Sequence, residues 1–203
     1  MKHIFHQGSD ARGPVLLLLH GTGGTEQDLI PLASHIDRGA SYLSVRGNVV
    51  ENGMPRFFRR LAEGVFDEVD LIARTKELHE FLDQAANDYG FDRSQVIALG
   101  YSNGANIAGS LIFHYPHALR GAILHHPMVP RRGVTLPDLK GMPIFMGAGR
   151  NDMMCSAQES EELKAILQGA HAEVTLHWEN AGHQLTSTEI AAAAAWYQEY
   201  FKK

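Results

Sequence analysis

The sequence is poor in cysteine and has no excess of positive charge. Cys155 is the single cysteine among 203 residues, which excludes an intramolecular disulfide and fits a reducing, cytoplasmic compartment. With 18 Lys and Arg residues against 23 Asp and Glu residues, the chain lacks the positive field that attracts nucleic acid, so no nucleic-acid partner is expected. The longest strongly apolar run, Val15 to Leu19, is too short for membrane insertion, and no signal peptide is expected.

Hydrophobic residues are present in the proportion typical of a folded protein. They make up 44% of the chain and charged residues 20%, which is too apolar and too evenly charged for a disordered segment. A chain of this length buries about 70% of its unfolded surface, so it needs neither a disulfide nor a metal to hold its core. We expect residues 1–203 to fold as one domain.

Segments typical of strands alternate with segments typical of helices along the chain. Strands are predicted over residues 15–19, 41–45, 95–99, 121–125, 143–146 and 173–177. Helices are predicted over residues 68–89, 103–115, 157–168 and 186–201, and a capping-box pattern at 25–28 predicts a further helix running to residue 36. This alternation predicts an α/β fold, a single doubly wound and mostly parallel sheet with helices on both faces and no cap domain.

Residues 46–67 interrupt the alternation. A stretch of about 20 residues without clear periodicity is unusual in a compact domain and is usually functional. It follows the strand predicted over 41–45 and therefore begins at the edge where parallel strands end. We expect this irregular segment to form a substrate wall or a small lid.

Residues 100–104, Gly-Tyr-Ser-Asn-Gly, match the pattern G-x-S-x-G between a predicted strand and a predicted helix. The two glycines permit a sharp strand-to-helix turn that holds the hydroxyl of Ser102 clear of the sheet. The helix N-terminus behind it favours developing negative charge. We interpret Ser102 as a catalytic nucleophile, the alternative being a plain glycine-flanked turn.

A serine hydroxyl is a weak nucleophile and needs a base oriented by a carboxylate. In this type of fold the order along the chain is serine, acid, histidine, each at the carboxyl end of a strand. Asp152 follows the strand predicted over 143–146, and His183 follows the strand predicted over 173–177. We therefore predict Asp152 and His183 as the acid and the base, against the alternatives of a turn aspartate and a solvated loop histidine.

Acyl transfer also needs an oxyanion hole, in which backbone N–H groups bind the tetrahedral oxygen. One donor is predicted at Asn103, the residue after the nucleophile, and the other at Thr22 in the glycine-rich loop 20–24 that follows the strand 15–19. A phosphate site is the alternative for this loop. The loop has neither the Lys-Ser/Thr of a Walker A sequence nor the spacing G-x-G-x-x-G.

Most candidate substrate-binding residues lie in the segment 46–67, and one lies at the end of the strand 121–125: Arg46, Met54, Arg56, Phe57, Phe58 and His125. The apolar members are expected to line an acyl or aryl pocket, and the arginines to attract a carboxylate or phosphate of the substrate. Acidic residues nearby offer the arginines alternative partners: Glu63, Asp67, Glu68 and Asp70. His125 and His126 point to opposite faces of a strand, so no metal site is predicted there.

Together these motifs resemble the α/β-hydrolase superfamily, specifically the phospholipase/carboxylesterase family, over nearly the whole chain. The matching stretches are 20–24, 100–104, 151–152 and 182–183. Within that family the chain is similar to the MhqD-like small bacterial carboxylesterases, through residues 44–48, 54–60, 101–106 and 182–186. The resemblance implies a triad of Ser102, Asp152 and His183 and no cofactor.

The chain also departs from the wider family pattern at two places. Asn103 stands where acyl-protein thioesterases usually carry Gln, and Met153-Met154-Cys155 stands where many relatives have Val-Pro. An oxyanion donor from the backbone survives both changes, whereas depalmitoylation of proteins is put in doubt. For Cys155, three residues after the acid, we favour a buried inert thiol over an oxidation sensor.

The sequence thus predicts a serine hydrolase that cleaves carboxylic esters with small or medium acyl or aryl groups. The expected partner is a small-molecule ester, and apolar residues around the pocket allow a homodimer. One alternative is a thioesterase or lysophospholipase that uses the same triad. Another is a non-catalytic binding protein on a hydrolase scaffold, although such proteins usually lose a member of the triad.

Overall fold

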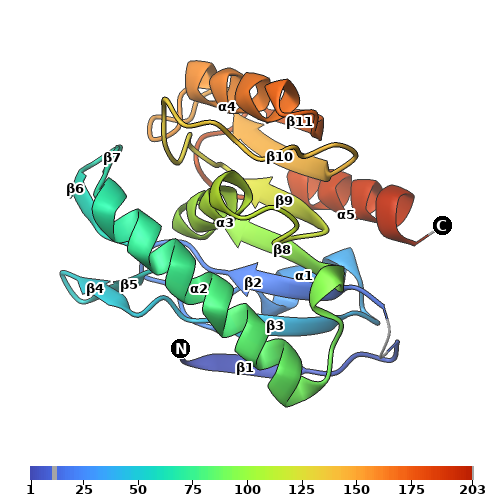
Figure 1. The fold of residues 1–203 in the computed structure, drawn as a ribbon. Helices are drawn as coiled ribbons and strands as arrows, with labels where there is room; N and C mark the ends of the chain where they lie inside the picture. The colour runs from blue at the N-terminus through green and yellow to red at the C-terminus, as the bar shows by residue number, and fades with distance from the viewer. Residues whose placement is uncertain (11–12, 203) are drawn as a thin grey trace.

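The computed structural model describes residues 1–10 and 13–202, and its centre is a seven-stranded sheet (Figure 1). The strand order is β1-β3-β2-β8-β9-β10-β11, with β1 antiparallel to β3 and the other pairs parallel. The bounds are β1 His3–His6, β2 Val15–Leu19, β3 Ser41–Val45, β8 Val96–Tyr101, β9 Gly121–His125, β10 Pro143–Gly149 and β11 Glu173–Glu179. The predicted mostly parallel sheet is confirmed, while the antiparallel strand β1 was not predicted.

Helices cover both faces of this sheet (Figure 1). Their bounds are α1 Ile30–Ile36, α2 Glu68–Tyr89, α3 Asn103–His114, α4 Ala157–Gly169 and α5 Ser187–Phe201, with a short 3-10 helix at Arg93–Gln95. α2 packs beside α3 on one face, and α1 packs beside α5 on the other. No cap domain is present in the described residues, as expected.

The central strand β2 shows why the apolar run folds between two layers. Leu17 and Leu19 belong to the core beneath α2 and α3, whereas Leu16 and Leu18 belong to the core beneath α1 and α5. Successive side chains of a strand point to opposite faces, so a strand covered on both sides must be apolar at every position. All four leucines are fully buried.

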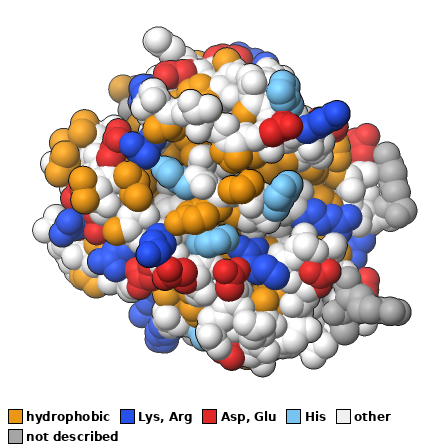
Figure 2. All heavy atoms as spheres, in the orientation of Figure 1, with side chains coloured by type: hydrophobic (Ala, Val, Ile, Leu, Met, Phe, Trp, Pro, Cys, Tyr) orange, Lys and Arg blue, Asp and Glu red, His pale blue; other side chains and the backbone are white. Residues whose placement is uncertain are grey.

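The long helix α2 begins and ends where the sequence predicts. The Asp67 side chain accepts a hydrogen bond from the N–H of Asp70 at its start, and Gly90 ends it with a φ of 72°. On the surface around α2, Lys and Arg side chains are interspersed with Asp and Glu (Figure 2). Arg74, for example, contacts both Asp70 and Glu77 on the same helix.

The first helix differs from its prediction. The capping-box pattern at 25–28 predicts a start near Thr25, but α1 begins at Ile30 with Pro31 in its first turn. Thr25 donates its hydroxyl hydrogen bond to Asp28 and stabilises a turn before the helix. Proline has no N–H and a φ already suited to a first turn, so the helix begins there.

The segment 46–67 is also more regular than predicted, because it contains two β-hairpins. β4 (Val49–Glu51) pairs with β5 (Met54–Arg56), and β6 (Arg60–Ala62) pairs with β7 (Val65–Phe66). The first turn is Asn52-Gly53 with φ values of 50° and 77°, the residue pair that a tight hairpin turn favours. Both hairpins lie at the end of the sheet toward which β2 and β8 run (Figure 1).

Among the described residues, no helix has the length and apolar character that crossing a membrane requires.

Candidate active site

Ser102 occupies the sharp turn between β8 and α3 that the G-x-S-x-G motif predicts. Its φ of 51° and ψ of −113° lie outside the regions that an L-residue ordinarily adopts. The flanking glycines are needed because the chain is crowded, since a Cβ on Gly104 would lie 1.9 Å from the carbonyl oxygen of Leu19. The strained turn therefore depends on close packing of α3 against β2.

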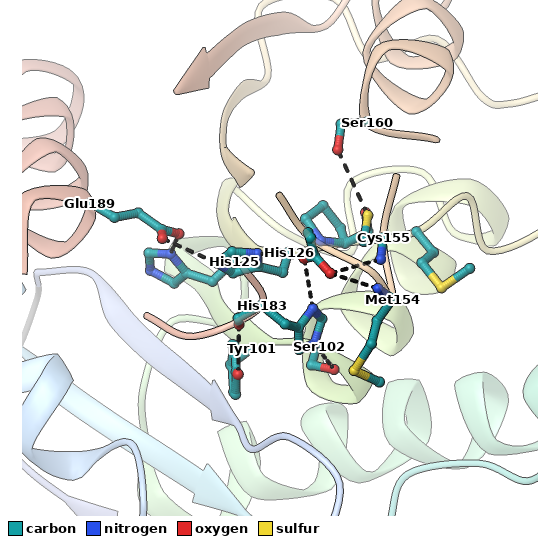
Figure 3. Close-up of polar contacts among 12 residues, drawn as sticks. Tyr101, Ser102, His125, His126, Met154, Cys155, Ser160, His183 and Glu189 are labelled. Carbon is teal, nitrogen blue, oxygen red and sulfur yellow. Dashed lines mark hydrogen bonds and ion pairs between the residues drawn. The ribbon is translucent and has the colours of Figure 1, made fainter. Parts of the chain in front are cut away.

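The structure brings Ser102, Asp152 and His183 together into one hydrogen-bonded chain (Figure 3). The Ser102 Oγ lies 2.8 Å from Nε2 of His183, and Nδ1 of His183 lies 2.7 Å from Oδ2 of Asp152. Asp152 follows β10 and His183 follows β11, so both stand at the carboxyl edge of the sheet beside the serine. In this geometry His183 can accept the serine proton and Asp152 can orient the ring.

Asp152 is held as a carboxylate by its surroundings. Burial raises its pKa, but the backbone N–H groups of Cys155 and Met154 and the ring of His183 outweigh burial, and the pKa is lowered. The two N–H groups donate to Oδ1 at 2.9 and 2.8 Å. Oδ2 is left to face the rings of His183 and His126.

The loop that carries His183 is fixed by Tyr101. The Tyr101 hydroxyl donates a hydrogen bond of 2.8 Å to the backbone carbonyl of His183. Burial, followed by the charges of Asp152 and Glu189, raises the pKa of Tyr101, so the phenol keeps its proton and remains a donor. The imidazole of His183 is thus positioned from its backbone as well as from Asp152.

The two residues predicted as oxyanion donors, Thr22 and Asn103, line the same pocket as Ser102. Asn103 is the first residue of α3, so its N–H has no partner within the helix. The N–H of Thr22 makes no hydrogen bond to any other described residue, while the next N–H, of Gly23, donates to the carbonyl of Pro55 at 2.9 Å. The Thr22 hydroxyl accepts a hydrogen bond of 2.6 Å from Arg56. Neither backbone N–H donates to another described residue, which is compatible with the predicted role.

A pocket of about 440 Å³, part of it open to solvent, lies over the serine and is named here the Ser102 pocket. Its wall combines apolar and polar side chains: Thr22, Arg56, Arg60, Glu63, Gly64, Phe66, Ser102, Asn103, Asn106, His126, Met128, Met154 and His183. A second hollow shares Ser102 and His183 with it and extends to Met54. Of the predicted substrate-binding residues, Arg56 and Met54 are therefore at the site.

Four predicted substrate-binding residues lie elsewhere. Phe57 and Phe58 are buried in the core on the α2 and α3 side of the sheet, because the first hairpin turns them inward. Arg46 forms an ion pair with Glu26 and does not line the Ser102 pocket. His125 is fully buried, and its Nδ1 forms a hydrogen bond with Oε1 of Glu189. These placements correct the expectation that all four face a substrate.

The arginines of the segment 46–67 form ion pairs with acidic side chains, which was the alternative to binding an anionic substrate. Some of these acids differ from the four that the sequence suggested. Arg59 contacts both Asp67 and Asp70. Arg56 and Arg60, by contrast, share the carboxylate of Glu51 at 3.2 and 3.6 Å. Since these two are also the arginines at the pocket wall, one acid serves two cations there.

The side chain of Asn103 links the elbow to the first hairpin. Its Oδ1 accepts a hydrogen bond of 2.7 Å from the N–H of Phe57, while its Nδ2 is buried without a partner. The residue that departs from the thioesterase pattern therefore anchors the pocket wall through its oxygen. No sequence signal indicated this contact.

Two residues other than the candidates selected from the sequence belong to the hydrogen-bond network of the site. His126, at the pocket wall, places Nδ1 3.0 Å from Oδ2 of Asp152 and Nε2 3.2 Å from Oε2 of Glu189. Glu189 lies in the first turn of α5, and its backbone N–H donates a hydrogen bond to the hydroxyl of Thr186. The pair of histidines at the end of β9 was the available signal, but His126 reaches the pocket and His125 does not.

His126, Asp152 and His183 are close enough to bind one metal ion, the single such group among the described residues. Their nitrogen and oxygen atoms are engaged in hydrogen bonds with one another. We therefore describe the cluster as a hydrogen-bond network.

Cys155 has the surroundings of an inert thiol. Its side chain is buried, and the thiol donates to the carbonyl of Pro127 at 2.9 Å. Burial raises its pKa to about 12, so the reactive thiolate is not populated near neutral pH.

The sheet order, the helices on both faces and the serine turn after β8 define the class of protein as an α/β-hydrolase. A family model described as Phospholipase/Carboxylesterase matches residues 3–199. The chain is 57% identical to a protein of Bacillus subtilis (strain 168) named as a hydrolase, MhqD, over 98% of each chain.

Two solved structures extend the comparison. The Bacillus cereus carboxylesterase is 66% identical, with a TM-score of 0.98 over 99% of this chain and 95% of that one. YahD, whose structure was determined with malic acid, is 30% identical, with a TM-score of 0.93 over 98% of each chain. The chain belongs to the phospholipase/carboxylesterase family, and it is a carboxylesterase-type hydrolase.

Proposed function

We propose that the chain hydrolyses small carboxylic esters through an acyl-serine intermediate. The Oγ of Ser102 attacks the ester carbonyl while Nε2 of His183 takes its proton. His183 then protonates the departing alkoxide, and Asp152 orients the imidazolium that forms between these steps. Water attacks the acyl-serine by the same route in reverse, releasing the carboxylic acid and restoring the serine hydroxyl.

The negative oxygen of each tetrahedral intermediate lies between two backbone donors in this proposal. They are the N–H groups of Thr22 and Asn103, and the second also carries the partial positive charge of the α3 N-terminus. Because both donors belong to the backbone, Asn103 can donate its N–H to the oxyanion as well as the Gln of related thioesterases can.

The observation that carries the proposal is the hydrogen-bonded chain from Ser102 through His183 to Asp152 at the floor of an open pocket. Distances of 2.8 and 2.7 Å join the three side chains. A non-catalytic binding protein has no need of this ordered proton path. The family relationship to carboxylesterases supports ester hydrolysis as its use.

Replacing the nucleophile tests the proposal directly. Ser102→Ala should lower kcat/KM for a short-chain aryl ester by at least about 10⁴-fold, because the attacking oxygen is lost. Steady-state kinetics measures the loss, and circular dichroism verifies the fold. Ser34→Ala, an exposed serine on α1, is the matched control and should keep wild-type activity. A folded Ser102→Ala variant with activity within tenfold of wild type would contradict the proposal.

A further inference from the structure

We propose that His126 is a buried imidazolium that positions Asp152 and sets the basicity of His183. The inference rests on the proposed function, because it concerns the base of that reaction. His126 contacts no reacting atom of the proposed mechanism, so it is a positioning residue and not a catalytic one.

The hydrogen bonds of His126 define its protonation state. Its side chain is fully buried, with Nδ1 3.0 Å from Asp152 Oδ2 and Nε2 3.2 Å from Glu189 Oε2. A carboxylate only accepts hydrogen bonds, so both ring nitrogens must donate, and an imidazole with two N–H groups is the cation. Figure 3 shows the ring lying between the carboxylate of Glu189 and the triad.

Ionisable groups on four other segments face this ring. They are Tyr101 at the end of β8, Asp152 after β10, His183 after β11 and Glu189 on α5, with His125 preceding it on β9. Burial lowers the pKa of His126, but Glu189 and Asp152 outweigh it, so the pKa is raised. Burial raises the pKa of Glu189, yet the rings of His125 and His126 bring it down to about 2.

His125 differs from its neighbour. Its Nδ1 contacts Oε1 of Glu189, but its Nε2 is buried without a hydrogen-bond partner. A proton on Nε2 of this ring would be buried without an acceptor, whereas each nitrogen of His126 faces a carboxylate. One carboxylate, Asp152, and the ring of His126 contact His183, and the second carboxylate, Glu189, binds the other nitrogen of His126.

This charge balance decides how easily His183 takes a proton. With His126 charged, the group formed by Asp152, Glu189 and His126 carries one net negative charge, as the Asp of an ordinary triad does. With His126 neutral, the two carboxylates would have no compensating cation, and their negative charge would favour a positive charge on the ring of His183. The cation thus keeps His183 available to accept the serine proton.

The backbone at two positions, His126 and Gly147, allows the buried groups of this network to contact one another. His126 has a φ of 54°, a left-handed conformation, and its N–H donates to the carbonyl of Gly147 at 2.8 Å. A Cβ on Gly147 would lie 1.9 Å from Oε1 of Glu189, so the carboxylate reaches the two histidines because residue 147 has no side chain. The left-handed backbone of His126 and the missing side chain at Gly147 are both needed for this arrangement of charged groups.

The pH profile of His126→Asn tests the inference. Asparagine tolerates the left-handed φ but carries no charge. Because the cation is lost, the acidic limb of kcat/KM, which reports the free base form of His183, should move up by about one pH unit. Activity should therefore fall more at pH 6 than at pH 9. The double variant His126→Asn with Glu189→Gln removes both charges and should return the limb toward its wild-type position.

His117→Asn is the matched control, because His117 has a φ of 58° and is exposed at the other end of β9. Its acidic limb should match that of the wild type. An unshifted limb in folded His126→Asn, or a uniform loss of activity at every pH, would overturn the inference.

A second measurement does not depend on activity. Nitrogen-15 NMR of the wild type, with the signal assigned through His126→Asn, should show both nitrogens of His126 protonated from pH 6 to pH 8. A neutral His126 ring at pH 7 would overturn the inference even in an active enzyme. If the wild type hydrolyses no ester but its His126 is charged, the proposed function fails and the buried cation stands.

Discussion

Arg56 and Arg60 show how single side chains give the Ser102 pocket its chemistry. Both line the pocket, and both contact the carboxylate of Glu51, which can neutralise only one of them. Arg56 is 4% exposed and is further held by Thr22, whereas Arg60 is 30% exposed. Glu63, an exposed acid on the same wall, opposes them. Arg60 is thus the cation best placed to meet a substrate.

We expect Arg60 to favour esters whose acyl group ends in a carboxylate, because it lines the Ser102 pocket and shares its acidic partner with Arg56. Arg60→Gln should raise KM for an aryl succinate half-ester about five- to tenfold, because a charge-assisted hydrogen bond is lost. For the matching aryl butyrate, KM of Arg60→Gln should differ from that of the wild type by less than about twofold.

Glu63→Gln is the opposing control and should lower KM for the half-ester, because it removes a like charge. Equal effects of Arg60→Gln on the charged and the neutral ester would contradict a role for Arg60 in selecting the acyl group.

The residues of the site were predictable where chain order and strand ends determine them. Three parallel strands end shortly before the residues Ser102, Asp152 and His183. The carboxyl ends of parallel strands lie at one edge of the sheet, and this does not depend on the conformation of the loops. Glu189 was not predictable, since a glutamate in the first turn of a helix already has a local explanation as part of a capping box. Its inward position depends on the missing side chain of Gly147, a contact between distant segments.

At the scale of elements, the contact of α3 with β2 holds the serine turn. The N-terminus of α3 approaches the end of β2 so closely that residue 104 has no room for a side chain. The helix is also buried at nearly every position. The element that presents Ser102 is therefore part of the core and not a surface helix.

Gly104→Ala should lower the free energy of unfolding by about 3 kcal/mol, because its Cβ would overlap a backbone carbonyl that cannot move aside. Urea denaturation measures the change. Gly169→Ala, at the end of α4 with no atom within 4 Å of its added Cβ, should change stability by less than about 1 kcal/mol. Equal stability of the two variants would show that the approach of α3 to β2 is not tight.

The elements of the segment 46–67 were the least predictable. Hydrophobic residues in a segment without periodicity can face either the core or a pocket, and pairing in the hairpins decides between them. Phe57 and Phe58 follow β5 and turn into the core, while Met54 at the start of β5 is exposed and lines a hollow that also contains Ser102. The pair Asn52-Gly53 is one that a tight hairpin turn favours, although no hairpin was predicted here, and the direction of the hairpin's side chains depends on how it packs against the sheet.

For the whole molecule, the sheet and its helices use most of the chain, and the two hairpins form part of the pocket wall. The Ser102 pocket is small and partly open. Three apolar side chains border it, namely Phe66, Met128 and Met154. A lysophospholipase or a long-chain thioesterase needs room for an extended acyl chain.

A series of acyl chain lengths distinguishes these activities. With aryl esters of acetate, butyrate, octanoate and palmitate, kcat/KM should be greatest for the two short acids and fall by at least about tenfold at palmitate, because the long chain stays in water. The corresponding thioesters should show the same order. A flat or rising response toward palmitate would favour the thioesterase or lysophospholipase alternative.

The central claim is that Ser102 forms the covalent intermediate, and labelling with a fluorophosphonate tests it most directly. The serine oxygen displaces fluoride at phosphorus, which adds one phosphonyl group to the protein. Mass spectrometry of the intact chain and of its peptides should find one label, on Ser102, and none in Ser102→Ala. A folded, unmodified Ser102 after prolonged exposure to excess reagent, or a label on another residue, would contradict the account.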